Sequence, residues 1–183
     1  ITDPDRRVLG VIRPTVEILG KVSLTRHIGL LATPGTVMSH SYAMEIEKIY
    51  PGMCITEKAC PMWVPLVETG EANGPGADYF VKKYVDECMT ADPDIDTLIL
   101  GCTHYPLLLD KIRQYTPQNV RILPQGELVA ESLADYLRRH PAMERECTKE
   151  GSVEFLTTES PDKFDSLATL FMQSPVASSR ITL

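Results

Sequence analysis

Long apolar runs are absent from this sequence of 183 residues, and none reaches the roughly 20 residues that a membrane-spanning helix needs. An excess of basic residues is also absent, because 18 Lys and Arg stand against 25 Asp and Glu and the net charge is −7. A dedicated nucleic-acid-binding protein normally carries a basic stripe. We therefore expect neither a membrane nor a nucleic acid as a partner. The hydrophobic share of 43% and the charged share of 23% are those of an ordinary globular protein.

Two further absences concern the start of the chain and its cysteines. Residues 1–7 contain no initiator Met and no apolar core of a signal peptide, so we expect a piece of a longer chain. The five cysteines are odd in number and irregularly spaced, which argues against a disulfide framework. Cys54 and Cys60 do not have the spacing of zinc ligands. The sequence thus predicts reduced thiols and a cytoplasmic location.

Short apolar runs alternate with stretches of helical periodicity along the chain. The pattern predicts strands at residues 8–12, 27–33, 55–59, 97–102, 120–123 and 153–157. It predicts helices at residues 36–50, 77–89, 106–115, 127–139 and 163–172, with a turn at 73–76 and a linker or surface loop at 140–151. Repeated strand–helix order predicts an α/β fold, in which a parallel sheet has helices on both faces. Ligands bind such sheets at the carboxyl ends of the strands.

The segment 98–106, Leu-Ile-Leu-Gly-Cys-Thr-His-Tyr-Pro, combines a buried strand with reactive side chains. Gly101 allows a close backbone approach, and Pro106 is typical of the first turn of a helix. The exposed amides at a helix start can hold a carboxylate or stabilise a thiolate. We therefore predict a lowered pKa and a reactive thiol for Cys102. His104 is a candidate proton partner or anion contact.

Three other interpretations of these residues stay open. Cys102 could be an inert thiol that closes a strand, since free cysteines are among the most buried residues. Cys102 and His104 could begin a zinc site, although their spacing matches one poorly. His104 could also be a structural residue that is held only by hydrogen bonds.

The segment 98–108, LILGCTHYPLL, resembles the signature around the second catalytic cysteine of glutamate racemases. Two other stretches resemble that family in the same order along the chain. Residues 28–37, with Ser39 and Tyr42, resemble its Thr-rich strand-to-helix turn, and residues 59–68 resemble a loop that ends in a Glu. The resemblance therefore implies the α/β fold of the aspartate and glutamate racemase superfamily.

The outer parts of the match define the domains that we expect. Residues 8–14 resemble the strand that opens the family's second domain. Residues 153–171 resemble the last strand and helix of proteins in the family. The resemblance implies that residues 1–118 form the second racemase domain, which contains the Cys-Thr-His strand. Residues 119–183 would be the returning segment of the first domain, which is then incomplete.

Glutamate racemases use two cysteines on opposite faces of the substrate: one thiolate removes the α-proton and the other thiol delivers a proton. Cys102 matches the cysteine that deprotonates L-glutamate, and Thr103 and His104 match residues that contact the substrate or assist this cysteine. Glu68 matches an acidic residue near the same His, whose proton affinity and orientation it could set. The resemblance thus implies catalytic roles for Cys102, His104 and Glu68.

Thr33 and Thr36 match positions near the carboxylate or amino group of the substrate, and Thr36 is the stronger candidate because it opens a helix. Each of these residues also has a purely structural interpretation. The two threonines could be helix caps, and Glu68 could be a surface carboxylate. Trp63 is expected in the core, and the remaining four cysteines are expected to be structural or incidental.

No cofactor is implied by the resemblance, and the sequence has neither a pyridoxal-lysine motif nor a Gly-rich phosphate loop. Residues 74–76 are a turn signal and not a phosphate-binding loop. No metal site is predicted. Because an amino-acid α-proton is a very weak acid, the site must supply oriented donors and exclude water.

The sequence departs from the family in two places. It lacks the Asp-Ser-Gly-Val-Gly-Gly and Ala-Cys-Asn-Thr stretches, which would supply the other catalytic cysteine and its acidic partner. Residues 124–126, Pro-Gln-Gly, stand where many relatives have an Asp-Ser pair after a strand. We therefore expect the chain by itself to be inactive and to need the missing N-terminal part of the same polypeptide.

The function implied is the conversion of L-glutamate to D-glutamate for bacterial peptidoglycan synthesis, with both enantiomers as ligands and a homodimer as one assembly. Two other functions stay open: a one-cysteine racemase or decarboxylase that acts on another acid, and a non-catalytic binding module that keeps the fold. The His-Tyr-Pro sequence after Thr103 favours glutamate over aspartate as the substrate.

Overall fold

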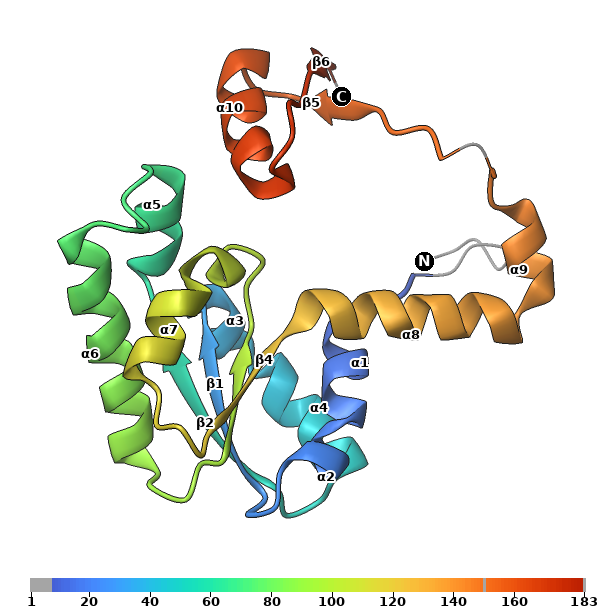
Figure 1. Cartoon of the computed structure of the whole chain (residues 1–183). Helices are drawn as coiled ribbons and strands as arrows, with labels where there is room; N and C mark the ends of the chain where they lie inside the picture. Colours follow the sequence, from blue (N-terminus) through green and yellow to red (C-terminus); the bar gives the residue numbers. More distant parts are fainter. Residues whose placement is uncertain (1–7, 150, 183) are drawn as a thin grey trace. The chain divides into compact units, whose positions relative to one another are not determined.

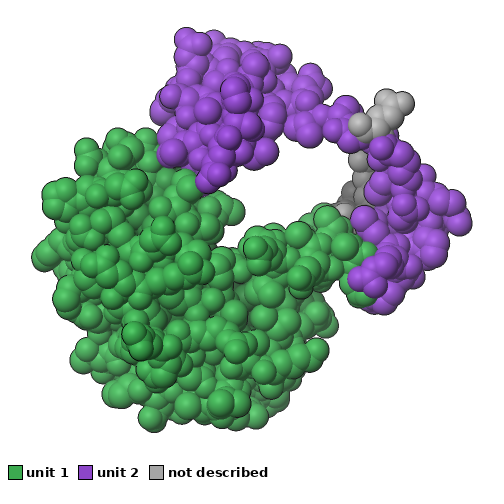
Figure 2. All heavy atoms as spheres, viewed as in Figure 1, with its two compact units in different colours: residues 1–136 green, residues 137–183 purple. Residues whose placement is uncertain are grey.

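The computed structural model describes residues 8–149 and 151–182. The chain divides into two compact units, residues 1–136 and residues 137–183, which Figure 2 colours separately. The first unit contains a four-stranded sheet, and the second contains a two-stranded sheet. Within the described residues, no helix has both the length and the apolar character that crossing a membrane requires.

The sheet of the first unit is entirely parallel, with the strand order β2-β1-β3-β4. Its strands are β1 (His27–Ala32), β2 (Cys54–Ala59), β3 (Thr97–Leu100) and β4 (Arg121–Pro124). The central strands β1 and β3 are almost completely buried, as expected for a parallel sheet that is covered on both faces. The prediction of a parallel α/β fold is therefore confirmed.

Helices cover both faces of this sheet, as Figure 1 shows. One face packs against α1 (Ile12–Glu17), α2 (Leu19–Val22) and α4 (Ser41–Ile49), whose apolar residues form one core with Ile28 and Leu30 of β1. The other face packs against α6 (Pro75–Ala91). Gly29 of β1 points to this face, because a Cβ atom there would lie 3.1 Å from the sulfur of Cys88 on α6. Successive residues of β1 thus face opposite layers.

Short helices follow the carboxyl ends of the strands. They are α3 (Pro34–Ser39) after β1, α5 (Trp63–Glu68) after β2, and η1 (Tyr105–Leu108) with α7 (Leu109–Tyr115) after β3. Trp63 is completely buried, and its indole Nε1 donates a hydrogen bond to the carbonyl oxygen of Phe80 at 3.3 Å. Its ring packs edge-on against Tyr105, with 4.7 Å between the centroids. The predicted core position of Trp63 is therefore confirmed.

Three predicted elements differ from the structure. Residues 8–12 are not a strand: Val8 is 70% exposed, and α1 begins at Ile12. Among the described residues no strand pairs with this segment, so its backbone groups have no ladder to join. The predicted helix 36–50 is divided at His40, whose φ of 49° is left-handed. The predicted loop 140–151 contains the short helix α9 (Pro141–Glu146), which starts at a proline.

The last strands and helices form the second unit, into which α8 (Gln125–Arg139) leads. They are β5 (Phe155–Thr157), α10 (Pro161–Met172) and β6 (Ser178–Arg180). Strand β6 pairs in parallel with β5, and its Ser-Ser-Arg sequence has no apolar pattern that would have predicted it. The compact units divide within α8, whereas the predicted racemase domains divide after residue 118. That domain assignment stays a prediction.

The close packing at Gly29 gives a stability test. A Cβ atom at this position would lie 2.4 Å from Cδ2 of Leu98, which is itself completely buried. We expect Gly29→Ala to lower the free energy of unfolding by about 1–3 kcal/mol, the usual effect of overpacking. Urea unfolding followed by the fluorescence of Trp63, the single tryptophan, measures this in the first unit.

The matched control for this test is Gly126→Ala. Gly126 lies in α8, and a Cβ atom there would meet no atom within 4 Å. An added methyl group in an open helical position is expected to raise the free energy of unfolding by up to about 1 kcal/mol. Equal unfolding midpoints for Gly29→Ala and the unsubstituted chain would contradict the packing described for β1.

Candidate active site

Cys102 lies where the backbone leaves the sheet after β3. The N–H of Gly101 donates a hydrogen bond to the carbonyl oxygen of Leu31 at 2.8 Å, which keeps the chain against β1 beyond the end of the strand. A Cβ atom at Gly101 would lie 2.9 Å from Leu30 Cδ1 and 3.1 Å from Ala32 Cβ. This confirms that Gly101 serves a close backbone approach. It sets the half-buried Cys102 at the carboxyl edge of the sheet.

An imidazole and a carboxylate extend from the thiol in one line of contacts. The sulfur of Cys102 lies 3.8 Å from Nδ1 of His104, and the other ring nitrogen, Nε2, lies 3.2 Å from Oε1 of Glu68. Oγ1 of Thr103 lies 3.5 Å from the same Nδ1. A proton on Nε2, shared with Glu68, leaves Nδ1 as an acceptor for the thiol proton. The arrangement can therefore pass a proton to and from the sulfur.

The electrostatics of Cys102 differ from the prediction. Burial raises the pKa of the thiol, and the negative charge of Glu68 raises it further. The backbone N–H groups of His104 and Thr103 donate to the sulfur and oppose this shift, but they do not reverse it. The predicted lowering of the pKa is wrong, because burial of the thiol outweighs the backbone N–H groups that favour the thiolate.

The remaining four cysteines lie in other environments. Cys60 and Cys88 are buried, and burial raises the pKa of both thiols, that of Cys88 to about 12. Cys54 and Cys147 are exposed. Cys102 differs from these four because it is half-buried and lies beside His104. This difference argues against the interpretation of Cys102 as an inert thiol.

The two predicted threonines lie at the carboxyl end of β1, next to the end of β3. Oγ1 of Thr33 accepts a hydrogen bond from the N–H of Thr36 at 3.3 Å and lies 3.0 Å from its Oγ1. Thr33 is the N-cap of α3, and Thr36 lies in the first turn of that helix. The helix-cap interpretation is thus confirmed for Thr33. Contact of either residue with a substrate stays a prediction.

Two residues near Cys102 were missed as site residues by sequence reasoning. Tyr42 on α4 is buried, and burial together with the negative charge of a Cys102 thiolate raises the pKa of its hydroxyl to about 12. Gln125, the first residue of α8, hydrogen-bonds to this hydroxyl and partly offsets the shift. Its position directly after β4 was the available signal, because polar residues at strand ends line ligand sites in such sheets.

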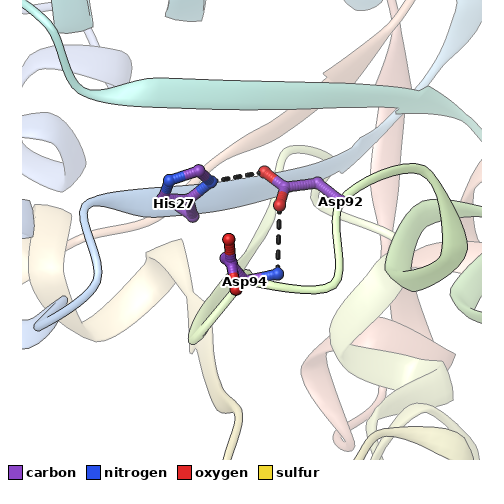
Figure 3. Close-up of side chains that lie close together, drawn as sticks. All are labelled: His27, Asp92 and Asp94. Carbon is purple, nitrogen blue, oxygen red and sulfur yellow. Dashed lines mark hydrogen bonds and ion pairs between the residues drawn. The ribbon is translucent and has the colours of Figure 1, made fainter.

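A second polar cluster lies at the opposite, amino end of β1, and Figure 3 shows it in close-up. Its members are His27, Asp92 and Asp94, whose ligand atoms lie within 4.8 Å of one another and are thus close enough to share a metal ion. Nδ1 of His27 lies 2.8 Å from Oδ2 of Asp92, and the N–H of Asp94 donates to Oδ1 of Asp92 at 3.0 Å. These bonds fasten the turn before β3 to β1, a structural role that is remote from Cys102.

No family model matches the chain. Its sequence is 38% identical over 179 residues to a glutamate racemase of Roseobacter denitrificans, an alignment that covers 92% of this chain and 64% of the relative. The chain is a homologue of the glutamate racemases. It spans about two-thirds of the length of the racemases that it matches.

Solved racemase structures share the fold of this chain. Glutamate racemase isoform RacE1 of Bacillus anthracis matches with a TM-score of 0.85 and 27% identity, over 98% of this chain and 66% of that one. The Francisella tularensis glutamate racemase, solved in complex with D-glutamate, matches with a TM-score of 0.78 and 26% identity, over 94% of this chain and 62% of that one. The expected racemase-like architecture is therefore confirmed.

The pair of His27 and Asp92 predicts a pH-dependent stability. The hydrogen bond to Asp92 raises the pKa of His27. Burial acts to raise the pKa of Asp92, but the bonds from His27 and Asp94 lower it overall. A histidine whose pKa is raised in the folded state stabilises that state fully when the pH lies below the pKa of the unfolded chain, about 6.5. This stabilisation disappears as the pH rises through the pKa of the folded state. His27→Asn should therefore destabilise clearly near about pH 5.5 and much less near about pH 9.

Urea unfolding of both proteins at the two pH values, read by Trp63 fluorescence, measures the difference. The same substitution in an Asp92→Asn background is the control, because it removes the partner and with it the pH dependence. If His27→Asn lowers the free energy of unfolding by the same amount at both pH values, the ion pair is refuted.

Proposed function

We propose that this chain is the portion of a glutamate racemase that supplies one of two proton-transferring cysteines, Cys102. The observation that supports the proposal most is the line of contacts from Cys102 through His104 to Glu68, in a homologue of glutamate racemases. Cys102 and His104 come from the segment after β3, and Glu68 ends α5, which follows β2. Ligands of such folds bind at the carboxyl edge of the parallel sheet.

In the proposed reaction, the thiolate of Cys102 takes the α-proton of L-glutamate. At neutral pH the resting side chain is the thiol, because its pKa is raised, so a base has to remove its proton first. Nδ1 of His104 is that base, and Glu68 stabilises the imidazolium that results. In the reverse direction the thiol delivers its proton to the substrate carbon, and the imidazolium of His104 then returns a proton to the thiolate.

The amino acid would lie across the carboxyl ends of β1 and β3. Thr33, Thr36 and Thr103 offer hydroxyl groups there, and these are candidate contacts for its carboxylate and amino groups. The Francisella tularensis relative was solved with D-glutamate, which supports glutamate as the ligand class. Carbanion formation needs such donors in fixed positions before the proton moves.

The rest of the proposal concerns the whole protein. The second cysteine and its acidic partner would come from the missing N-terminal part of the polypeptide, and no cofactor would take part. The product, D-glutamate, would be used for peptidoglycan synthesis in a bacterial cytoplasm, and the racemase would act as a homodimer. The part that this chain contributes to catalysis is Cys102 with His104 and Glu68.

The chain by itself should not racemise glutamate. We expect no D-glutamate above background when the purified chain is incubated with L-glutamate, because one thiol serves only one face of the substrate. The full-length protein should be active, and its Cys102→Ala variant should lose about 10²-fold or more of its activity, as is typical when an acid–base group is removed. Chiral chromatography of the product measures both proteins.

Cys54→Ala is the matched control for the full-length protein, since Cys54 is exposed and lies at the opposite end of the sheet. It should retain normal activity. Turnover by the isolated chain that disappears in Cys102→Ala would instead support the one-cysteine interpretation.

Self-association of the isolated chain is a further expectation of the same proposal. Four large apolar side chains are exposed among the described residues of the second unit: Val153, Leu156, Leu170 and Met172. Apolar surface that belongs against an absent segment promotes association. We expect the mass measured by light scattering to rise with concentration, and we expect Leu156→Lys with Leu170→Lys to reduce this rise. A concentration-independent monomer whose residues 151–182 are protected from hydrogen exchange would contradict the expectation.

A further inference from the structure

Helix α3 carries the candidate threonines, but packing holds it only weakly. None of its six residues is buried, and Val37 packs only in part against the core of the first unit. Thr33 caps the first turn, where its Oγ1 accepts from the N–H of Thr36. At the other end, α3 runs directly into α4 through one residue, His40. Because so short a helix is marginal by itself, its position depends on what fastens these two ends.

His40 is the joint between the two helices, and its backbone conformation is uncommon. Its φ of 49° and ψ of 22° are left-handed. Its N–H donates to the carbonyl oxygen of Val37 at 3.1 Å, and its own carbonyl oxygen accepts from the N–H of Met44 at 2.9 Å. Glycine adopts this conformation freely, whereas a histidine in it is strained. Such strain persists where surrounding groups fix the residue, so the side chain of His40 needs an explanation.

The imidazole of His40 bonds to a carboxylate of the sheet. Its Nδ1 lies 2.6 Å from Oε2 of Glu57, which belongs to β2. Because a carboxylate only accepts hydrogen bonds, Nδ1 carries the hydrogen and donates it. The side chain of His40 is 66% exposed, whereas that of Glu57 is only 11% exposed. The bond thus joins the end of α3 to a side chain in the interior of the first unit.

Glu57 lies on an apolar face of the sheet. It is directly opposite Leu30 in the register of β1 and β2, so both side chains point to the face that α1, α2 and α4 cover. Its other oxygen, Oε1, is buried and has no hydrogen-bond partner in the described part of the chain. A buried carboxylate is costly unless it is bonded. The bond from His40 is therefore a strong tie and not an incidental surface contact.

We propose that the bond between His40 and Glu57 ties α3 to β2 and thereby positions the threonines of that helix for the substrate. Both are positioning residues: Glu57 acts through His40, and His40 acts through the backbone of α3. The tie is a property of the fold, and only its effect on substrate binding rests on the proposed function.

Hydrogen exchange of the 183-residue chain tests the tie itself. His40→Gly removes the imidazole and introduces a residue that adopts a positive φ without strain. We expect the amides of α3 to exchange faster by about tenfold or more, as is typical when a hydrogen bond to a charged group is lost. The amides of β1 should exchange as before. Mass spectrometry of the peptides that cover residues 33–40 and 27–32 measures both rates.

Glu57→Leu separates the tie from overall stability. Replacing a buried charged pair by apolar side chains of similar size often leaves stability unchanged or raises it. The urea midpoint, read by Trp63 fluorescence, should therefore not fall, yet α3 should exchange faster, as in His40→Gly. His40→Asn should restore the original exchange rate, because its amide nitrogen replaces Nδ1 as the donor and asparagine tolerates a positive φ.

The full-length protein tests the positioning role. His40→Gly should raise KM for L-glutamate by about threefold or more and change kcat by less than about twofold, because contacts that substrate and transition state share affect KM alone. His40→Asn should return KM toward its original value. Lys82→Gln is the control, since it breaks an exposed ion pair with Asp86 on α6 and should change neither KM nor the exchange of α3.

Unchanged exchange of α3 in folded His40→Gly would overturn the proposal. If this variant does not fold, Glu57→Leu decides in the same way. Faster exchange together with an unchanged KM would remove the positioning role and leave the proposed function intact. Faster exchange in a chain whose full-length protein has no racemase activity would instead refute the proposed function and leave the tie intact.

Discussion

The hydrogen bond from the N–H of Gly101 to the carbonyl oxygen of Leu31 is the constraint on which the site depends. It extends the pairing of β1 and β3 by one step past the end of β3, at a place where a side chain larger than hydrogen would collide with Leu30 and Ala32. The chain can then leave the sheet only at Cys102. The thiol, the imidazole of His104 and the caps of α3 consequently share one edge of the sheet, although they come from distant parts of the sequence.

The location of Cys102 has an electrostatic cost. Cys102 is buried enough for its pKa to rise, and Glu68, which orients His104, adds a negative charge that raises it further. A thiol in this state is a poor base by itself. It acts as a base only when neighbouring groups take its proton and stabilise the anion. The backbone N–H groups of Thr103 and His104 and the imidazole of His104 lie beside it. Pre-positioned groups of this kind stabilise a charge without having to reorganise when the charge forms.

Much of the fold could be predicted from periodicity. The apolar runs at 27–33 and 97–102 correspond to β1 and β3 because a strand that is buried on both faces leaves little room for polar residues. Residues 8–12 have the same apolar character, yet they form no strand, because an apolar run becomes one only when a partner strand is present. Strand β6 is the opposite case, since its pairing with β5 and not its composition makes it a strand.

By itself the sequence determined which reactive side chains are available to a candidate site: a cysteine, a histidine and an acid in a pattern that resembles one enzyme family, with the strand-to-helix turn that carries the thiol. Only the tertiary structure decided how that thiol behaves. Its pKa depends on how deeply the fold buries it, on the backbone N–H groups of His104 and Thr103, and on the charge of Glu68, which the fold brings to it from another element. Burial and long-range proximity are properties of the packed chain, and no local pattern of residues specifies them.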